Sequence, residues 1–223
     1  MLATIGFITA GLCFWAFAYT FDSLVAHKAK LKLSQFSYAY YSLGLALFTW
    51  GMAAAVNKPD FLKHAVLVGD GYLLLGTVFM LDIWFGKKNR RPWLGLAVLL
   101  AAALLYVRAV HFPPAPYMHN GILIFNTQRV VAAVLGLIFA GIWLPVSLRV
   151  AKLVTHKIGQ DSITQTYSGI YVAATASALF FLIVRRTATV ILSFVALGIC
   201  FALLVFSNVL VAKLTETKHG RRK

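Results

Sequence analysis

Seven apolar runs of membrane-spanning length dominate this chain of 223 residues. A helix needs about 20 mostly apolar residues to cross the hydrocarbon core of a bilayer. Hydrophobic residues make up 61% of the chain, charged residues 12%, and the mean hydropathy is +0.81, which is far more apolar than a soluble domain. The sequence therefore predicts an all-α integral membrane protein, a bundle of seven transmembrane helices at about 2–21, 36–56, 64–85, 92–110, 123–148, 166–184 and 187–212.

These runs leave no polar stretch long enough for a separate soluble domain. We therefore expect one seven-helix domain over 1–212 and a short basic cytoplasmic tail over 213–223. Only Arg185-Arg186-Thr187 separates the last two runs. A single long broken helix is thus the alternative to two separate spans at the end of the chain.

The positive charges lie unevenly between the two sides of the predicted bundle. Fifteen Lys and Arg residues fall in the first, third and fifth breaks and in the tail, and six fall on the opposite side. Cytoplasmic loops carry the excess of Lys and Arg, so the pattern predicts an external N-terminus and a cytoplasmic C-terminus. It also explains the formal net charge of +15 without a nucleic-acid partner. We expect a multi-pass protein of the bacterial cytoplasmic (inner) membrane that attracts anionic lipids on its cytoplasmic side.

Several residues predict local features of the bundle. Gly69 and Gly76 are seven residues apart, so they share one face of the third span and permit close helix contact there. Pro145 should kink the fifth span or end it early. The proline-containing loop over 111–121 is either a plain connector or a cover over the outer mouth of the bundle. Aromatic anchors at the membrane interfaces are expected at Trp50, Trp84, Trp93 and Trp143.

The third span carries a carboxylate, Asp70, inside its apolar run. A charge at the centre of a membrane helix costs at least about 2.5 to 3.5 kcal/mol, so this side chain needs a partner. If the third span enters at His64 and the fifth at Leu123, Asp70 and Arg129 both lie about six residues deep, or about 9 Å. The sequence therefore predicts an Asp70–Arg129 ion pair.

Asn126 and Gln128 lie beside Arg129 in the sequence, so we expect the pair to sit in a locally polar pocket. Two interpretations remain open for this pocket: a purely structural ion pair, or a ligand, proton or ion site built on it.

Further basic residues fall at the predicted outer side of the bundle. They could form a basic vestibule above Asp70 that attracts an anionic solute or lipid head group. Scattered interfacial residues with snorkelling side chains are the alternative. The residues expected in this vestibule are Arg108, His111, Arg185 and Arg186.

Several classes of chemistry lack the residues they need. All six histidines fall in loops or at span ends, so no facing pair of mid-membrane histidines is available to ligate haem. Cys13 and Cys200 give no metal-ligand spacing, and the sequence contains none of the common hydrolase or phosphate-binding motifs. We expect no metal and no cofactor, and an enzyme is the class with least support.

Two resemblances bear on function. Seven helices with an external N-terminus resemble the microbial rhodopsins, but the middle of the seventh span, Ala196-Leu-Gly-Ile-Cys-Phe-Ala-Leu203, has no lysine to hold retinal. The overall length, the basic loop His27-Lys-Ala-Lys-Leu-Lys32 and the segment Leu47-Phe-Thr-Trp-Gly51 are similar to the seven-helix sensor region of bacterial histidine kinases. The second resemblance implies a sensory role in which the signal passes to another protein.

Three functions are consistent with the sequence. The first is a non-enzymatic, receptor-like or sensory bundle that binds a small or lipidic ligand and acts through a protein partner or a homo-oligomer. The second is an accessory or structural subunit of a membrane complex. The third is a small transporter or channel that uses Asp70 and Arg129. The scarcity of polar residues along the spans favours the first two.

Overall fold

The computed structural model describes residues 2–26, 34–85 and 90–158 of the chain. Within these residues, five helical segments are long and apolar enough to cross a membrane. The predicted class, a multi-pass helical membrane protein, is confirmed for this part of the chain. The predicted spans at 166–184 and 187–212 and the predicted tail lie outside the described residues.

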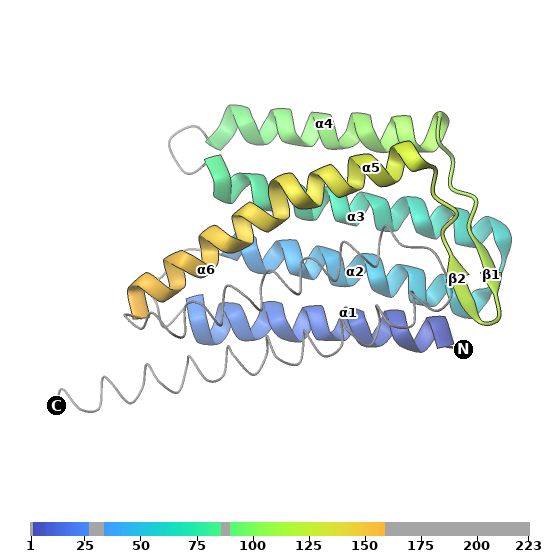
Figure 1. The fold of residues 1–223 in the computed structure, drawn as a ribbon, viewed down its shortest axis with the longest axis horizontal. Helices are drawn as coiled ribbons and strands as arrows, with labels where there is room; N and C mark the ends of the chain where they lie inside the picture. The colour runs from blue at the N-terminus through green and yellow to red at the C-terminus, as the bar shows by residue number, and fades with distance from the viewer. Residues whose placement is uncertain (1, 27–33, 86–89, 159–223) are drawn as a thin grey trace.

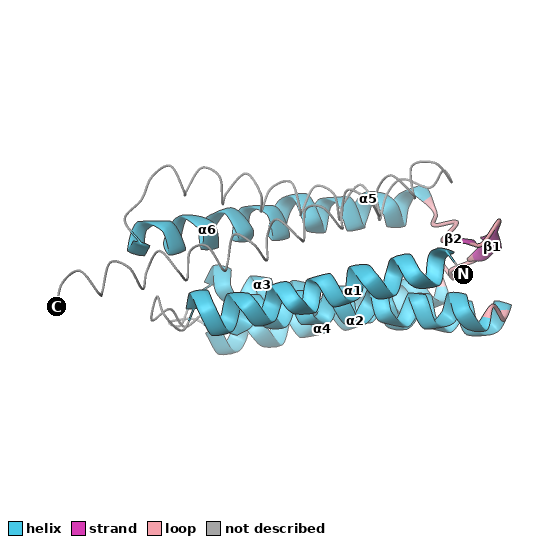
Figure 2. Ribbon diagram, turned by 90° about the horizontal axis from the view of Figure 1, so that it is seen from below, coloured by secondary structure: helices cyan, strands magenta, loops and turns pink. Residues whose placement is uncertain are grey.

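The first four spans form one layer of antiparallel helices (Figure 1). They are α1 (Leu2–Thr20), which continues into the π-helical turn η1 (Phe21–Ala26), then α2 (Ser34–Val56), α3 (Pro59–Phe85) and α4 (Arg90–Val110). Each helix from α2 to α4 packs against the helix before it. The fifth span is a continuous rod of α5 (Arg129–Ile138), the π-helical stretch η2 (Phe139–Trp143) and α6 (Leu144–Ile158). Figure 2 shows this rod lying across one face of the four-helix layer.

The two ends of the bundle differ in their connections. At one end α1 begins and α2 turns into α3 through Asn57 and Lys58; a β-hairpin also lies there, so we call it the hairpin end (Figure 1). Asn57 adopts a left-handed φ of 53°, which Asn tolerates, and Pro59 begins α3 where its missing amide is not needed. The opposite end, where α6 ends at Ile158, is called the basic end, because α6 carries Arg149 and Lys152 in its middle turns.

The predicted start of the fifth span at residue 123 is wrong. Residues 117–124 form an antiparallel hairpin of β1 (Tyr117–His119) and β2 (Ile122–Ile124), and the helix begins only at Arg129. Asn120 and Gly121, with φ of 48° and 77°, make the two-residue turn that suits the twist of paired strands. Apolar residues after this turn therefore pair as a strand, although their hydropathy alone is compatible with a helix.

The hairpin covers the ends of α1 and α2. All three residues of β2 are buried, and this strand contacts α1. Phe125, just after β2, packs edge-on against Phe7 of α1 and Trp50 of α2, with ring centroids 5.8 and 4.8 Å apart. The residues that cover the helix ends thus lie at 122–125, just after the loop over 111–121 that the sequence left open as a connector or a cover; within that loop, Met118 packs against the core.

Two of the four tryptophans expected as interfacial anchors are core residues instead. Trp50 and Trp143 are each only 1% exposed, whereas Trp84 and Trp93 are exposed. The glycine face of α3 accounts for this difference, because a Cβ at Gly69 would overlap the Trp50 indole and one at Gly76 would lie 2.9 Å from Trp143. The close-contact groove predicted from Gly69 and Gly76 is therefore confirmed, and indoles from α2 and η2 fill it.

Pro145 neither ends the fifth span nor interrupts it. The helix continues for thirteen residues beyond it to Ile158, and the irregularity lies before the proline, in η2. Proline lacks the amide that would bond to the carbonyl of Gly141, one turn earlier. A π-helical turn is one way in which a helix accommodates such a local change in its hydrogen bonding.

Candidate functional site: an ion pair at an apolar cleft

A buried ion pair links α3 to α4 near the hairpin end. The Nε of Arg108 donates to Oδ2 of Asp70 at 3.0 Å, and both side chains are almost completely buried. Nη1 of Arg108 also donates to the carbonyl oxygen of Phe112, just beyond α4. One guanidinium thus joins α3, α4 and the segment that leads into the hairpin.

Helix geometry explains why these two residues meet. In two antiparallel neighbouring helices, residues at equal distances from their connection lie at the same level. Asp70 lies 15 residues before Phe85, the last residue of α3, and Arg108 lies 18 residues after Arg90, the first residue of α4. Both therefore sit about 25 Å from the connection, within one helical turn of each other.

The predicted Asp70–Arg129 pair is wrong, and Arg108 takes the place of Arg129. Because the hairpin occupies residues 117–124, Arg129 is the first residue of α5 and is exposed at the hairpin end. Asn126 and Gln128 are also exposed, so they do not supply a polar pocket. The prediction failed because a six-residue error in the start of the fifth span moved Arg129 about 9 Å along the helix axis.

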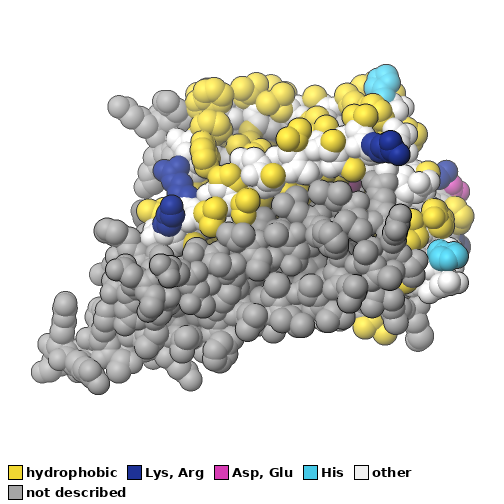
Figure 3. Space-filling view, in the orientation of Figure 1, with side chains coloured by type: hydrophobic (Ala, Val, Ile, Leu, Met, Phe, Trp, Pro, Cys, Tyr) yellow, Lys and Arg dark blue, Asp and Glu magenta, His cyan; other side chains and the backbone are white. Residues whose placement is uncertain are grey.

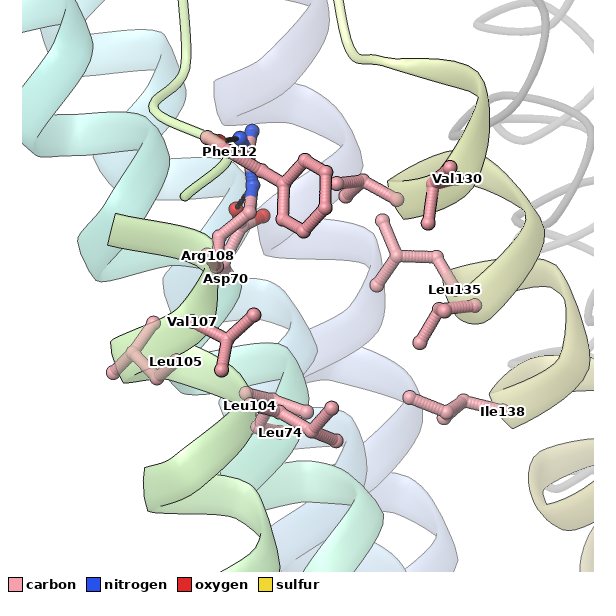
Figure 4. Close-up of a pocket in the computed structure, with 12 residues that line it drawn as sticks. Asp70, Leu74, Leu104, Leu105, Val107, Arg108, Phe112, Val130, Leu135 and Ile138 are labelled. Carbon is pink, nitrogen blue, oxygen red and sulfur yellow. Dashed lines mark hydrogen bonds and ion pairs between the residues drawn. The ribbon is translucent and has the colours of Figure 1, made fainter. Parts of the chain in front are cut away.

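The ion pair lies at one end of an elongated apolar cleft between α4 and α5 (Figure 4). About 540 Å³ of space lies between its lining residues, including space open to the outside. Its first wall contains Asp70 and Leu74 of α3 and the C-terminal part of α4. The side chains of α4 and of the following segment are Leu104, Leu105, Val107, Arg108 and Phe112, and those of the α5 wall are Val130, Val131, Val134, Leu135 and Ile138.

The basic vestibule expected around Asp70 is not formed by Arg108. This residue is 7% exposed and is engaged by the carboxylate, whereas His111 is exposed just after α4. Arg185 and Arg186 lie outside the described residues. Within the described part of the chain, the feature beside Asp70 is thus a buried ion pair at one end of an apolar cleft.

The chemistry of the cleft favours binding over catalysis. Apolar walls with a few placed polar groups are typical of sites that bind small apolar or amphiphilic molecules. Arginine has five N–H donors, and its contacts with Asp70 and Phe112 use two of them. The remaining donors suit a hydrogen-bond acceptor on a ligand. Among residues 2–26, 34–85 and 90–158, no group of three or more metal-binding side chains is present.

Comparisons with known proteins add no relative from which to transfer a function. No protein-family model matches the chain, and no curated protein or solved structure matches it. The resemblances to sensor regions and rhodopsins therefore stay expectations, and the site is interpreted from its own residues.

Proposed function

We propose that this protein is a non-enzymatic, receptor-like or sensory membrane protein that binds a lipidic amphiphile in the α4–α5 cleft. The observation that supports this proposal is the combination of apolar walls with Asp70 and Arg108 at one end. An alkyl chain would lie between Leu104 and Leu135, and a hydrogen-bond-accepting head would meet Arg108.

The fifth span offers a route from this cleft to a partner protein. Its α5 portion forms one wall of the cleft, and the same rod continues through η2 into α6 at the basic end. A ligand between α4 and α5 would change the position of the rod, provided that it binds one position better than the other. A partner that contacts the basic end would then receive the signal.

A filled-cleft variant tests this function. Leu135→Trp places a larger side chain in the cleft, and Leu137→Trp is the matched control, because Leu137 is 73% exposed on the same helix and does not line the cleft. Binding of a fluorescent long-chain fatty acid to the protein in nanodiscs would be measured for both. We expect Leu135→Trp to weaken binding by about tenfold or more, or at least about 1.4 kcal/mol, and Leu137→Trp to leave it unchanged.

The result is informative only if both variants fold, so their thermal unfolding midpoints should be compared with that of the original protein. Equal binding by the two folded variants would contradict the assignment of the cleft as the ligand site.

For the whole chain we propose seven spans with the N-terminus outside and the C-terminus in the cytoplasm. The fifteen-to-six imbalance of Lys and Arg supports this orientation. The hairpin end would then face outward. A reporter fused after Lys223 should be active only in the cytoplasm, and a cysteine at Tyr117, which is exposed in β1, should react with an impermeant reagent from outside. Labelling of both positions from one side would contradict the seven-span topology.

The second candidate function, an accessory subunit of a membrane complex, is supported by the surface of α4. Only 11% of the residues in the most apolar 18-residue stretch of this helix are buried, and Leu99 is 69% exposed. Figure 3 shows hydrophobic side chains gathered along this helix. A photo-reactive residue at position 99 should cross-link to a second protein in native membranes if α4 is a subunit contact. Cross-links to lipid alone would count against this function.

A further inference from the structure

A second hollow lies at the basic end of the bundle, away from the α4–α5 cleft. About 1130 Å³ of space, including space open to the outside, lies between Trp84 at the end of α3 and the first ten residues of α6. The residues that line it are Trp84, Pro145, Leu148, Arg149, Lys152 and Leu153. We call this feature the α3–α6 groove.

Arg149 bridges the two helices at this groove. Its Nη1 donates to the carbonyl oxygen of Trp84 at 3.2 Å, and its Cζ lies 5.9 Å from the centroid of the Trp84 ring. Trp84 is the penultimate residue of α3, so its carbonyl has no partner one turn further along that helix. One role of Arg149 is therefore to cap α3. A guanidinium has five N–H donors, so this role leaves donors for another acceptor.

The groove is lined by both basic and apolar side chains. Arg149 and Lys152 are three residues apart, which places their charges on one face of α6. Pro145, Leu148 and Leu153 are the apolar residues of the lining, and Pro145 and Leu148 come before Arg149 along α6. Trp84 is the penultimate residue of α3, and tryptophan is common near the ends of membrane spans. Basic side chains gather at this end of the face shown in Figure 3.

We propose that the α3–α6 groove is a binding site for an anionic phospholipid. Its phosphate would accept hydrogen bonds from Arg149 and would be attracted by the ammonium group of Lys152, and an acyl chain would lie along Pro145 and Leu148. Bidentate hydrogen bonding makes arginine especially suitable for phosphate. Basic pockets between transmembrane helices near the membrane surface bind anionic lipid head groups by the same combination. This site is independent of the amphiphile proposed for the α4–α5 cleft.

Retention of phosphatidylglycerol and of phosphatidylcholine by the intact protein, measured by native mass spectrometry, tests the site. The test variants are Lys152→Gln and the double variant Arg149→Gln/Lys152→Gln. The matched control is Lys58→Gln/Lys63→Gln, which removes the same charge from exposed positions at the hairpin end. A basic residue near an anionic surface contributes about 1 kcal/mol, so Lys152→Gln should weaken phosphatidylglycerol binding about fivefold and the double variant about 30-fold.

The control variant should lose less than about threefold, and retention of phosphatidylcholine should not change in any variant. Because Arg149 also caps α3, the double variant is informative only if its unfolding midpoint is retained; Lys152→Gln tests the site without removing this cap. Equal losses in the test and control variants would show diffuse attraction to the whole protein and overturn the proposal. Equal retention of the two lipids by the original protein would overturn it as well.

Discussion

Arg108 of α4 donates a hydrogen bond from Nε to Oδ2 of Asp70 in α3, at 3.0 Å. Both side chains are buried, in the part of the two helices nearer the hairpin end. This pair places a polar contact at one end of a cleft that is otherwise apolar. It also fixes the segment after α4 through the carbonyl of Phe112.

The first prediction concerns the energy of this pair. Asp70→Asn or Arg108→Gln leaves one buried charge without its partner, so each should lower the free energy of unfolding by about 3 to 5 kcal/mol. The double variant should lose much less than the two single losses added together. Arg129→Gln is the control, because Arg129 is exposed, and it should change stability by less than about 0.5 kcal/mol.

Thermal or denaturant unfolding in nanodiscs measures this cycle. Additive losses in the double variant would show that Asp70 and Arg108 are not energetically coupled. A large loss in Arg129→Gln would instead restore the pairing expected from the sequence.

The second prediction concerns the hairpin cover. Phe125→Ala removes two edge-on aromatic contacts, with Phe7 and Trp50, and apolar burial over the ends of α1 and α2. We expect a loss of about 2 to 3 kcal/mol from the two terms together. Tyr117→Ala, at an exposed aromatic residue of the same hairpin, should cost less than about 1 kcal/mol. Similar unfolding midpoints for the two variants would show that the hairpin does not hold the helix ends.

The third prediction tests the glycine face of α3. A Cβ at Gly69 would overlap the Trp50 indole, so Gly69→Ala should destabilise the protein by about 1 to 3 kcal/mol. Gly95 of α4 has no atom within 4 Å of the corresponding position, so Gly95→Ala should be neutral or stabilising by up to about 1 kcal/mol. Unfolding of both variants under one condition makes the comparison. Equal tolerance at the two glycines would show that α2 and α3 are not in close contact at Gly69.

The fourth prediction concerns a buried hydrogen bond between α3 and η2. The Trp143 indole N–H donates to Thr77 Oγ1 at 2.9 Å, and both residues are buried. Thr77→Val leaves the indole N–H without this acceptor, so it should cost about 1 to 3 kcal/mol. If the unpaired N–H causes the loss, Trp143→Phe should reduce the additional effect of Thr77→Val. An unchanged effect in the Trp143→Phe background would assign the loss to packing of Thr77 instead.

The membrane class and the first four spans were predictable, because a spanning helix is recognised from the length and apolar composition of a run of residues. The first four apolar runs are helices in the structure. The glycine groove was predictable because helical periodicity places Gly69 and Gly76 on one face. Burial of Trp50 and Trp143 was not, because it depends on which neighbouring helix meets that face. Hydropathy indicates that a segment lies in the membrane, but it does not predict which way an indole side chain points.

The site was missed for a different reason. Depth along a helix depends on where the helix begins, and the fifth span begins at Arg129, not at Leu123. Two signals in the sequence would have corrected this: Asn120-Gly121 is a strong hairpin turn, and Asp70 and Arg108 lie at similar distances from the break between the third and fourth spans. The depth of a residue in the membrane is predicted more accurately from its distance to a short connection between two helices than from its distance to a predicted span end.

Photo-cross-linking from within the α4–α5 cleft tests the central claim most directly. A photo-reactive amino acid would replace Val134, which lines the cleft, or Leu137, which is exposed on the same helix. Adducts formed in native membranes would then be identified by mass spectrometry. A ligand site predicts that position 134 captures a lipidic amphiphile strongly enriched over its share of the membrane, whereas position 137 captures the bulk lipids. The same bulk lipid mixture at both positions would contradict the proposed function.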